Sequence, residues 1–312
     1  MFTKSSKRVI FMIKNTKEAY EYSLLIEQGI LAMNNNFKKG KKKKIIYDFN
    51  CKEYKELKEK YNVEKIAGSG TSYEKAKRLL NYFSPKLSHE SNYDNHVHCN
   101  SLSLLEYSFN NPDHGINCLN KAKIFSELCL SIGIFARRVI ILPYSPYDMD
   151  NHVVTEIYDE KMDKWIMMDP TTNGMFIDEN KNPLSILGIR DNFSRNKFVT
   201  YISCNEKEQD IFKIQKKYLY ENWYICKNLF RFMVDSYQGF GEKENGHTYL
   251  NFYPIGFSVK KWDIENAKYR LKQIEKNYPQ FLESARINYK EVLNEREAPA
   301  HSIEFLYNQI NI

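Results

Sequence analysis

The sequence lacks any apolar run long enough to cross a membrane. A membrane-spanning helix needs about 20 consecutive apolar residues, whereas the longest early run is the short "VIFMI" at residues 9–13. This run is also too short for the apolar centre of a signal peptide. We therefore expect a cytoplasmic protein that does not contact a membrane.

The sequence also lacks the regular cysteine spacing of a small disulfide-bonded fold. Six cysteines are scattered unevenly over 312 residues, at Cys51, Cys99, Cys118, Cys129, Cys204 and Cys226. Free thiols in a reducing compartment are the expected state. Paired CxxC motifs and calcium-loop patterns such as D-x-D-x-D-G are missing, so we expect neither a metal nor a cofactor.

The charge balance gives little information about partners. The formal net charge is +7, but Lys, Asn, Ile and Tyr are abundant throughout the chain, which indicates a compositional bias. The densest basic run, "FKKGKKKK" at residues 37–44, could contact an acidic surface or nucleic acid. No nucleic-acid motif accompanies it, so a solvated loop is the preferred interpretation and no nucleic-acid partner is expected.

The periodicity of apolar residues predicts one compact unit in three segments. Residues 1–100 read as a short strand followed by helices, residues 101–200 as a core in which one helix is followed by strands, and residues 201–312 as an α-rich extension packed on the core. The last segment contains a long aromatic-rich helix pattern at residues 206–233 and a strand pair around residues 248–259. With 42% hydrophobic residues, the chain can bury a sizeable core.

A cysteine stands where a helix begins, in the stretch "DHGINCLNKAKIFSEL" at residues 113–128. Asn117 is a suitable N-cap, and Gly115 lets the chain bend into the first turn. The helix is expected to run from Cys118 to a stop at Gly133. A thiol at a helix N-terminus, next to a basic partner, is favoured as the nucleophilic thiolate. The alternative is an inert, small apolar residue.

A candidate base and its partner lie on a predicted hairpin further along the chain. Residues 152–158 and 164–169 have strand length, and a two-residue loop of Glu160 and Lys161 would place His152 directly opposite Asp169. Both side chains would then share one face, so that the carboxylate holds one ring nitrogen and leaves the other for a thiol. Taken singly, each residue could equally have a structural role.

Together these residues resemble the transglutaminase-like superfamily, whose papain-like core carries a Cys-His-Asp triad in this chain order. The resemblance covers about residues 101–172 and rests on "GINC", "GIFARRV", "HVVTEIYD" and "KWIMMDPT". Cys118 matches the nucleophile, His152 the base and Asp169 the orienting carboxylate. Ala136 and Arg137 match the Ala-Arg pair that usually follows the helix.

The resemblance implies an α+β fold, with the nucleophile helix packed on a small antiparallel sheet, and a thiol enzyme. Acyl transfer or hydrolysis on a protein or peptide amide would pass through a thioester, which an amine acceptor or water then resolves. The alternatives are a catalytically idle binding module with this fold and a peptide N-glycanase-like amidase. Phe135 stands where the family usually has proline. The Cys118 amide is one expected oxyanion donor, and the second is unassigned.

Three other features have two interpretations each. "NHVHC" at residues 95–99, with His89 and His114, could bind zinc, but its spacing is not that of a common zinc motif, and a polar loop is preferred. The aromatic helix could be a stacking platform for bases or sugars, although aromatics at helical spacing more often fill a core. Trp165 could pack beneath the triad or simply in the core.

Overall fold

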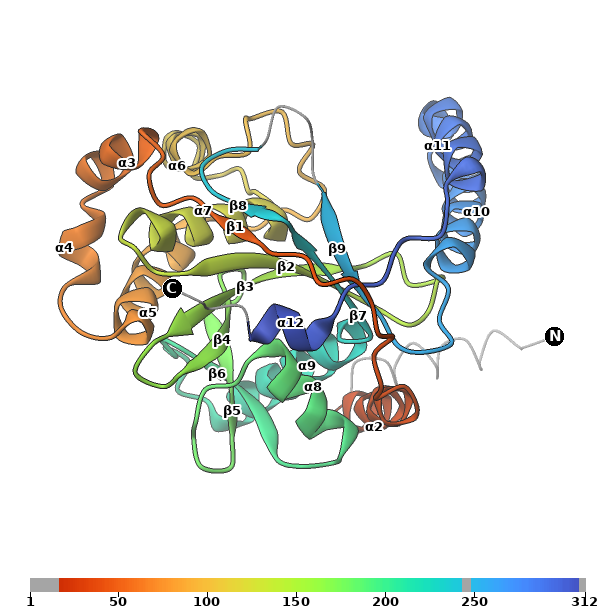
Figure 1. Ribbon diagram of the computed structural model, residues 1–312, viewed down its shortest axis with the longest axis horizontal. Helices are drawn as coiled ribbons and strands as arrows, with labels where there is room; N and C mark the ends of the chain where they lie inside the picture. Colours follow the sequence, from red (N-terminus) through yellow and green to blue (C-terminus); the bar gives the residue numbers. More distant parts are fainter. Residues whose placement is uncertain (1–16, 243–247, 309–312) are drawn as a thin grey trace.

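A computed structural model of the chain describes residues 17–242 and 248–308. The short strand expected before the first helix would fall within residues 1–16, which lie outside the described residues. Within them, the fold centres on one seven-stranded sheet in the order β6-β5-β4-β3-β2-β7-β9, in which every neighbouring pair is antiparallel (Figure 1). The strands are β2 (Ala136–Leu142), β3 (His152–Asp159), β4 (Lys164–Asp169), β5 (Gly174–Asp178), β6 (Val199–Ser203), β7 (Arg231–Asp235) and β9 (Tyr249–Phe252). A separate parallel pair joins β1 (Ile46–Tyr47) to β8 (Tyr237–Gln238).

Helices cover both faces of the sheet (Figure 1). The first face carries the helices α3 (Glu53–Tyr61), α4 (Val63–Ala67), α5 (Ser72–Phe83), α6 (Ser101–Asn110) and α7 (Cys118–Ser131), with the short 3-10 helix η1 (Ser84–Lys86). The second face carries α2 (Lys17–Met33), α8 (Ile186–Ser194), α9 (Ile211–Asn228) and α12 (Ile303–Tyr307). A helical pair, α10 (Val259–Asn277) and α11 (Leu282–Asn294) with η2 (Pro279–Phe281) between them, stands off one end of the molecule.

The alternation of side chains along β3 separates the two hydrophobic cores. Ile157 packs into the core beneath α7, whereas Val154 packs into the core beneath α8 and α9. Because successive residues of a strand point to opposite faces, His152 and Glu156 share the face of Val154. The central strand is buried on both sides, which fixes its register.

The α+β architecture with an antiparallel sheet, expected from the resemblance, is confirmed. The basic run at residues 38–44 is an exposed loop. The helix predicted over residues 206–233 is wrong at its end, because α9 stops at Asn228 and residues 231–235 form β7 between β2 and β9. Pairing with two strands distant in sequence outweighs the local helical pattern there. Of the predicted strand pair at residues 248–259, one strand, β9, is present.

Phe135, at the turn between α7 and β2, packs against aromatic rings instead of bending the chain as proline would. Its ring lies 5.1 Å from that of Tyr47 and 4.9 Å from that of Phe49, edge to face in both cases.

Among the described helices, none is both long enough and apolar enough to cross a membrane.

Candidate active site

The helix α7 begins where the sequence predicts. The side-chain oxygen of Asn117 accepts a hydrogen bond from the amide of Asn120 at 3.1 Å, and Cys118 is the first helical residue. Gly133, with a φ of 81°, follows the helix end. The thiol of Cys118 is half-buried at the positive end of the helix dipole.

Gly115 has a role different from the predicted one. It does not have a positive φ; instead, the neighbouring Ile116 forms a β-bridge with His89. A Cβ atom on Gly115 would lie 2.6 Å from the backbone nitrogen of Glu90. Glycine is therefore required because two backbone segments approach each other closely, not because the chain bends.

The predicted register of the hairpin is wrong by two residues. Asp159 pairs with Lys164 and Thr155 with Met168, so the turn contains residues 160–163 instead of two residues. The carboxylate of Asp159 accepts the amide of Met162 at 2.9 Å and stabilises this longer turn. A shift of two preserves the face on which each side chain lies, because the side-chain period of a strand is two.

His152 and Asp169 therefore meet diagonally across the two strands. The Nε2 atom of His152 lies 2.8 Å from Oδ2 of Asp169, and both side chains are almost completely buried. The second oxygen of Asp169 accepts the amide of Thr171 at 2.8 Å. This second bond fixes the carboxylate in the turn that follows β4, so it holds the imidazole ring in one orientation.

Cys118 completes a row with these two side chains. Its thiol is near enough to His152 to help raise the pKa of the ring, whose Nε2 is already occupied by Asp169. The other ring nitrogen, Nδ1, is therefore the one available to the thiol. The structure thus brings together all three residues that the sequence analysis selected, from the start of α7, the start of β3 and the end of β4.

The electrostatics of this row favour a charged histidine. Burial alone would lower the pKa of His152, but the charge and hydrogen bond of Asp169, together with Cys118, outweigh it and raise the pKa well above its ordinary value. For Asp169, burial would raise the pKa, yet the facing His152 and the Thr171 amide hold it below its ordinary value. An imidazolium beside a sulfur atom is the arrangement that stabilises a thiolate.

Cys118 and His152 open onto a cavity of about 620 Å³. Its wall combines the start of α7, the segment before β3, the turn after β4 and one face of α9. Tyr224 from α9 covers His152, with the two rings 5.3 Å apart and edge to face. A cavity of this size accepts a substrate group of several heavy atoms beside the sulfur.

The sequence analysis missed the contribution of α9. It assigned the aromatic residues of this helix to the core, but Tyr220, Glu221 and Tyr224 line the cavity. Burial, together with the nearby Asp169, raises the pKa of Glu221 to about 7, although His152 and Lys217 partly oppose this. Helical periodicity identified the buried face, but it carried no signal that this face borders a cavity.

Two further cationic or titratable side chains, Lys121 and His89, lie near the row. Lys121, one turn after Cys118, is buried, and its Nζ donates to the carbonyl of Leu87 at 2.7 Å. Burial lowers the pKa of Lys121 to about 8, although Asp169 and Cys118 act in the opposite direction. His89 lines the cavity, and burial together with the positive charge of Lys121 lowers its pKa.

Two of the histidines considered as zinc ligands bond to neighbouring polar side chains. His89 bonds to Ser91 at 3.1 Å, and His96 contacts Asp94. Within residues 17–242 and 248–308, no three His, Cys, Asp or Glu side chains are arranged to hold a metal ion. Trp165 packs in the core. The guanidinium carbon of Arg137 lies 3.7 Å from the centre of the Trp165 ring.

Comparison with known proteins supports one family. Residues 59–170 match the family model of the transglutaminase-like superfamily, a stretch that includes the start of α7, all of β3 and the end of β4. Comparisons with curated proteins and with solved structures give no match. Members of this superfamily are commonly cysteine-based enzymes with a papain-like fold. Residues 59–170 of this chain are therefore similar to the core of the transglutaminase-like superfamily.

Proposed function

We propose that the chain is a transglutaminase-like thiol enzyme that acts on a protein or peptide amide. Cys118 is the nucleophile, His152 the general base and acid, and Asp169 the residue that orients the imidazole. The observation that carries this proposal is the row of three side chains, in which the Asp169 carboxylate is hydrogen-bonded to the buried His152 ring and the thiol of Cys118 lies near that ring.

The proposed reaction has two halves. The Cys118 sulfur attacks the amide carbonyl carbon, and the C–N bond breaks as His152 gives its proton to the leaving amine. A thioester remains on Cys118. An incoming amine or water then loses a proton to His152 as it attacks the thioester, which releases the product and restores the thiol.

The start of α7 offers one stabilising group for the oxyanion. The amide of Asn120 is occupied by Asn117, whereas the amide of Cys118 makes no hydrogen bond within the described part of the chain. An amide N–H at this position points with the helix dipole and can donate to the developing negative oxygen.

Alkylation of the thiol by iodoacetamide tests the proposed row. At neutral pH, Cys118 should be alkylated selectively, because its thiol opens onto the cavity and lies near His152. The other five cysteines are internal references, because burial raises the pKa of each of their thiols. Peptide mapping by mass spectrometry identifies which thiol has reacted.

Two histidine variants provide the matched comparison. His152→Ala should slow alkylation of Cys118 at this pH by about 100-fold, the size of a general-base contribution. His114→Ala removes an exposed histidine four residues before Cys118 and should leave the rate unchanged. Equal rates in the two variants would contradict the proposed enzyme and favour an idle binding module.

The fate of the thioester separates transfer from hydrolysis. A casein or peptide donor rich in glutamine is incubated with a fluorescent primary amine, and both amine incorporation and ammonia release are measured. Incorporation that requires Cys118 indicates an acyltransferase. Ammonia release without incorporation indicates an amidase, a class that includes peptide N-glycanase-like activity.

A further inference from the structure

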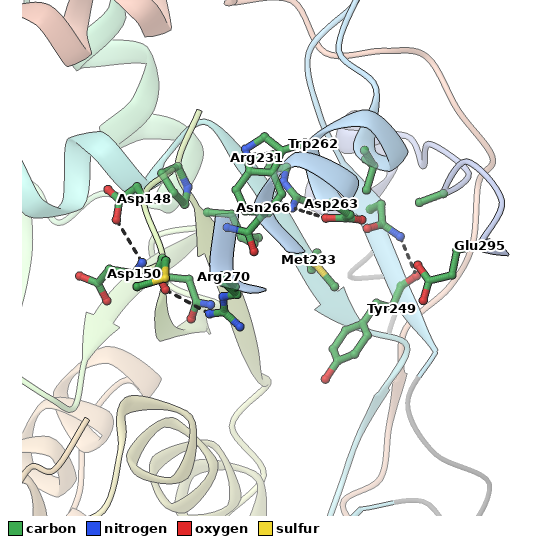
Figure 2. A pocket seen from close by; sticks show the side chains of 17 residues that line it. Asp148, Asp150, Arg231, Met233, Tyr249, Trp262, Asp263, Asn266, Arg270 and Glu295 are labelled. Atoms are coloured by element: carbon green, nitrogen blue, oxygen red, sulfur yellow. Dashed lines mark hydrogen bonds and ion pairs between the residues drawn. The ribbon is translucent and has the colours of Figure 1, made fainter. Parts of the chain in front are cut away.

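A second cavity adjoins the candidate active site. It encloses about 530 Å³ between the segment after β2, the strands β7 and β9, and the helix α10 (Figure 2). Met149, Asp150, Asn151, Tyr249 and Arg270 line both this cavity and the one that holds Cys118. The two cavities therefore share a wall and are neighbouring parts of one recessed surface.

The carboxylates of this second cavity already have partners. Asp148 lies 2.7 Å from Nζ of Lys227, and Asp150 lies 3.5 Å from the same atom. Asp263, on α10, accepts a hydrogen bond from Arg231 at 3.3 Å (Figure 2). Glu295, at the rim, is exposed to solvent. The acceptor groups in the wall are thus bonded or hydrated.

The two guanidinium groups are not satisfied in the same way. Arg231 is only 3% exposed, and its single side-chain bond within the described residues is the 3.3 Å contact with Asp263. Its Nε is buried without an acceptor there, and the group is stacked over Trp262 at 4.6 Å. Arg270 makes one bond, to the carbonyl of Met149 at 3.3 Å. Because a guanidinium has five N–H donors, Arg231 keeps buried donors without an acceptor, and Arg270, which is exposed, can exchange bound water for a ligand.

The charge balance of the wall indicates which acceptor it fits. Four carboxylates, Asp148, Asp150, Asp263 and Glu295, line the cavity together with the two arginines. The surroundings are therefore not cationic, and an anion would meet repulsion from several sides. A neutral group with strong acceptor oxygens, such as a peptide carbonyl, can use the free donors without that cost.

We propose that this second cavity is a subsite for the polypeptide that flanks the reactive amide, whose backbone carbonyl oxygens accept hydrogen bonds from Arg231 and Arg270. This inference rests on the proposed function, since it extends the site of Cys118 along the wall that the cavities share. A volume of this size suits a ligand as large as a few amino-acid residues. The helix α10 would thereby select polypeptides over small amides.

Peptide-linked alkylating probes test this subsite. The rate of Cys118 alkylation is measured with iodoacetamide and with iodoacetyl-capped tetrapeptide amides that carry Gln, Glu or Lys side chains. The Gln peptide should react about tenfold faster than iodoacetamide, as expected for one or two added hydrogen bonds. The Lys peptide should gain about as much, because its backbone carbonyls are the same. The Glu peptide should gain less, because four carboxylates line the cavity. A larger gain for the Glu peptide would overturn the proposal in favour of a carboxylate site.

Variants on α10 and β7 then locate the effect. Arg270→Met and the double variant Arg231→Met with Asp263→Asn should each bring the ratio of Gln-peptide rate to iodoacetamide rate close to one. Arg286→Met, on the exposed surface of α11, is the matched control and should keep the wild-type ratio. Because Arg270 is exposed, its variant gives the result even where the double variant fails to fold.

The two proposals can fail separately. An iodoacetamide rate that does not depend on His152 contradicts the proposed function. A wild-type ratio that Arg270→Met leaves unchanged contradicts the subsite, even where His152→Ala slows iodoacetamide.

Discussion

Two buried ion pairs lie on the same face of β3, four residues apart. They differ in whether all their hydrogen-bonding groups have partners within the fold. Arg137 and Glu156 are opposite each other on β2 and β3 and are joined by two hydrogen bonds of 2.6 and 2.9 Å. The second oxygen of Glu156 accepts the amide of Ile186 and the hydroxyl of Tyr307, each at 2.8 Å. Aromatic rings cover the guanidinium on both sides.

The pair of His152 and Asp169 is equally buried but not enclosed in the same way. One ring nitrogen is bonded to Asp169, while the thiol of Cys118 and an open cavity lie on the other side of the ring. A pair with all its bonding groups occupied stabilises the fold. A pair with one group facing a thiol and a cavity can take part in a reaction, and the predictions below test this distinction.

Asp169→Asn should give the largest effect of all the variants, and this effect should be a loss of turnover. The asparagine keeps the size of the side chain but loses the charge that raises the pKa of His152. Loss of the orienting carboxylate in a triad lowers turnover by about 10⁴-fold in a serine protease, and we expect about 10³-fold or more here. Amine incorporation or ammonia release measures it. Asp178→Asn, on the neighbouring strand β5, should retain activity; similar losses in both variants would contradict the orienting role.

Glu156→Ala should reduce stability most. Removing one partner leaves the guanidinium of Arg137 buried without its counter-charge, which costs about 3–5 kcal/mol in unfolding free energy. Urea denaturation measures the loss. Glu179→Ala, at an exposed turn, should change stability by less than about 0.5 kcal/mol. The enclosed pair would have no stabilising role if the two variants unfolded at the same urea concentration.

Glu221→Gln should change how stability depends on pH. The folded-state pKa of Glu221, about 7, exceeds the ordinary value of 4.5. The folded protein therefore binds this proton more tightly, and stability falls as pH rises from about 4.5 to about 7. The variant lacks this loss, so above pH 7 it should be more stable than the wild type by about 3 kcal/mol. Thermal unfolding at several pH values measures the difference.

The pH dependence of this stability difference separates an effect of charge from an effect of packing. Below about pH 4.5 the carboxyl group is protonated in both the folded and the unfolded states, and the two proteins should unfold at similar temperatures. A difference that is independent of pH would mean that packing, not the charge of Glu221, causes it. Glu179→Gln, which changes an exposed carboxylate, is the control.

Asn117→Ala should give the smallest effect, about 1 kcal/mol, because it removes the N-cap of α7. Ser185→Ala removes the equivalent cap of α8, whose oxygen accepts the amide of Gly188 at 3.1 Å, and should cost about the same. Only Asn117→Ala should also slow alkylation of Cys118, because Asn117 caps α7 and Cys118 is the first residue of that helix. Equal alkylation rates would show that the cap serves folding alone.

Local sequence signals were sufficient for the helix of Cys118 and for the faces of the hairpin. An asparagine before the helix and a glycine after it mark its ends through backbone hydrogen bonding, which acts over a few residues. The hairpin register was predicted two residues away from the observed one. Asp159 stabilises a longer turn, which the strand pattern alone does not reveal. His152 and Asp169 nonetheless stay on one face, since the error is a whole period.

Long-range packing decided what local signals could not. The strand β7 follows α9 directly and forms because β2 and β9 offer partners on both sides. The cavity-facing role of Tyr220 and Tyr224 depends on where α9 docks against β6 and β2. Neither effect is encoded in the periodicity of the segment itself.

The sequence by itself determined the residue types, their order and the helix start that holds the thiol, because caps and strand periodicity act between near neighbours. Only the tertiary structure decided the diagonal contact of imidazole and carboxylate, the cavity beside the sulfur and its extension toward α10. The diagonal contact depends on the register of the hairpin. The cavities are formed by segments more than 100 residues apart, whose relative positions depend on how the whole sheet and its helices pack.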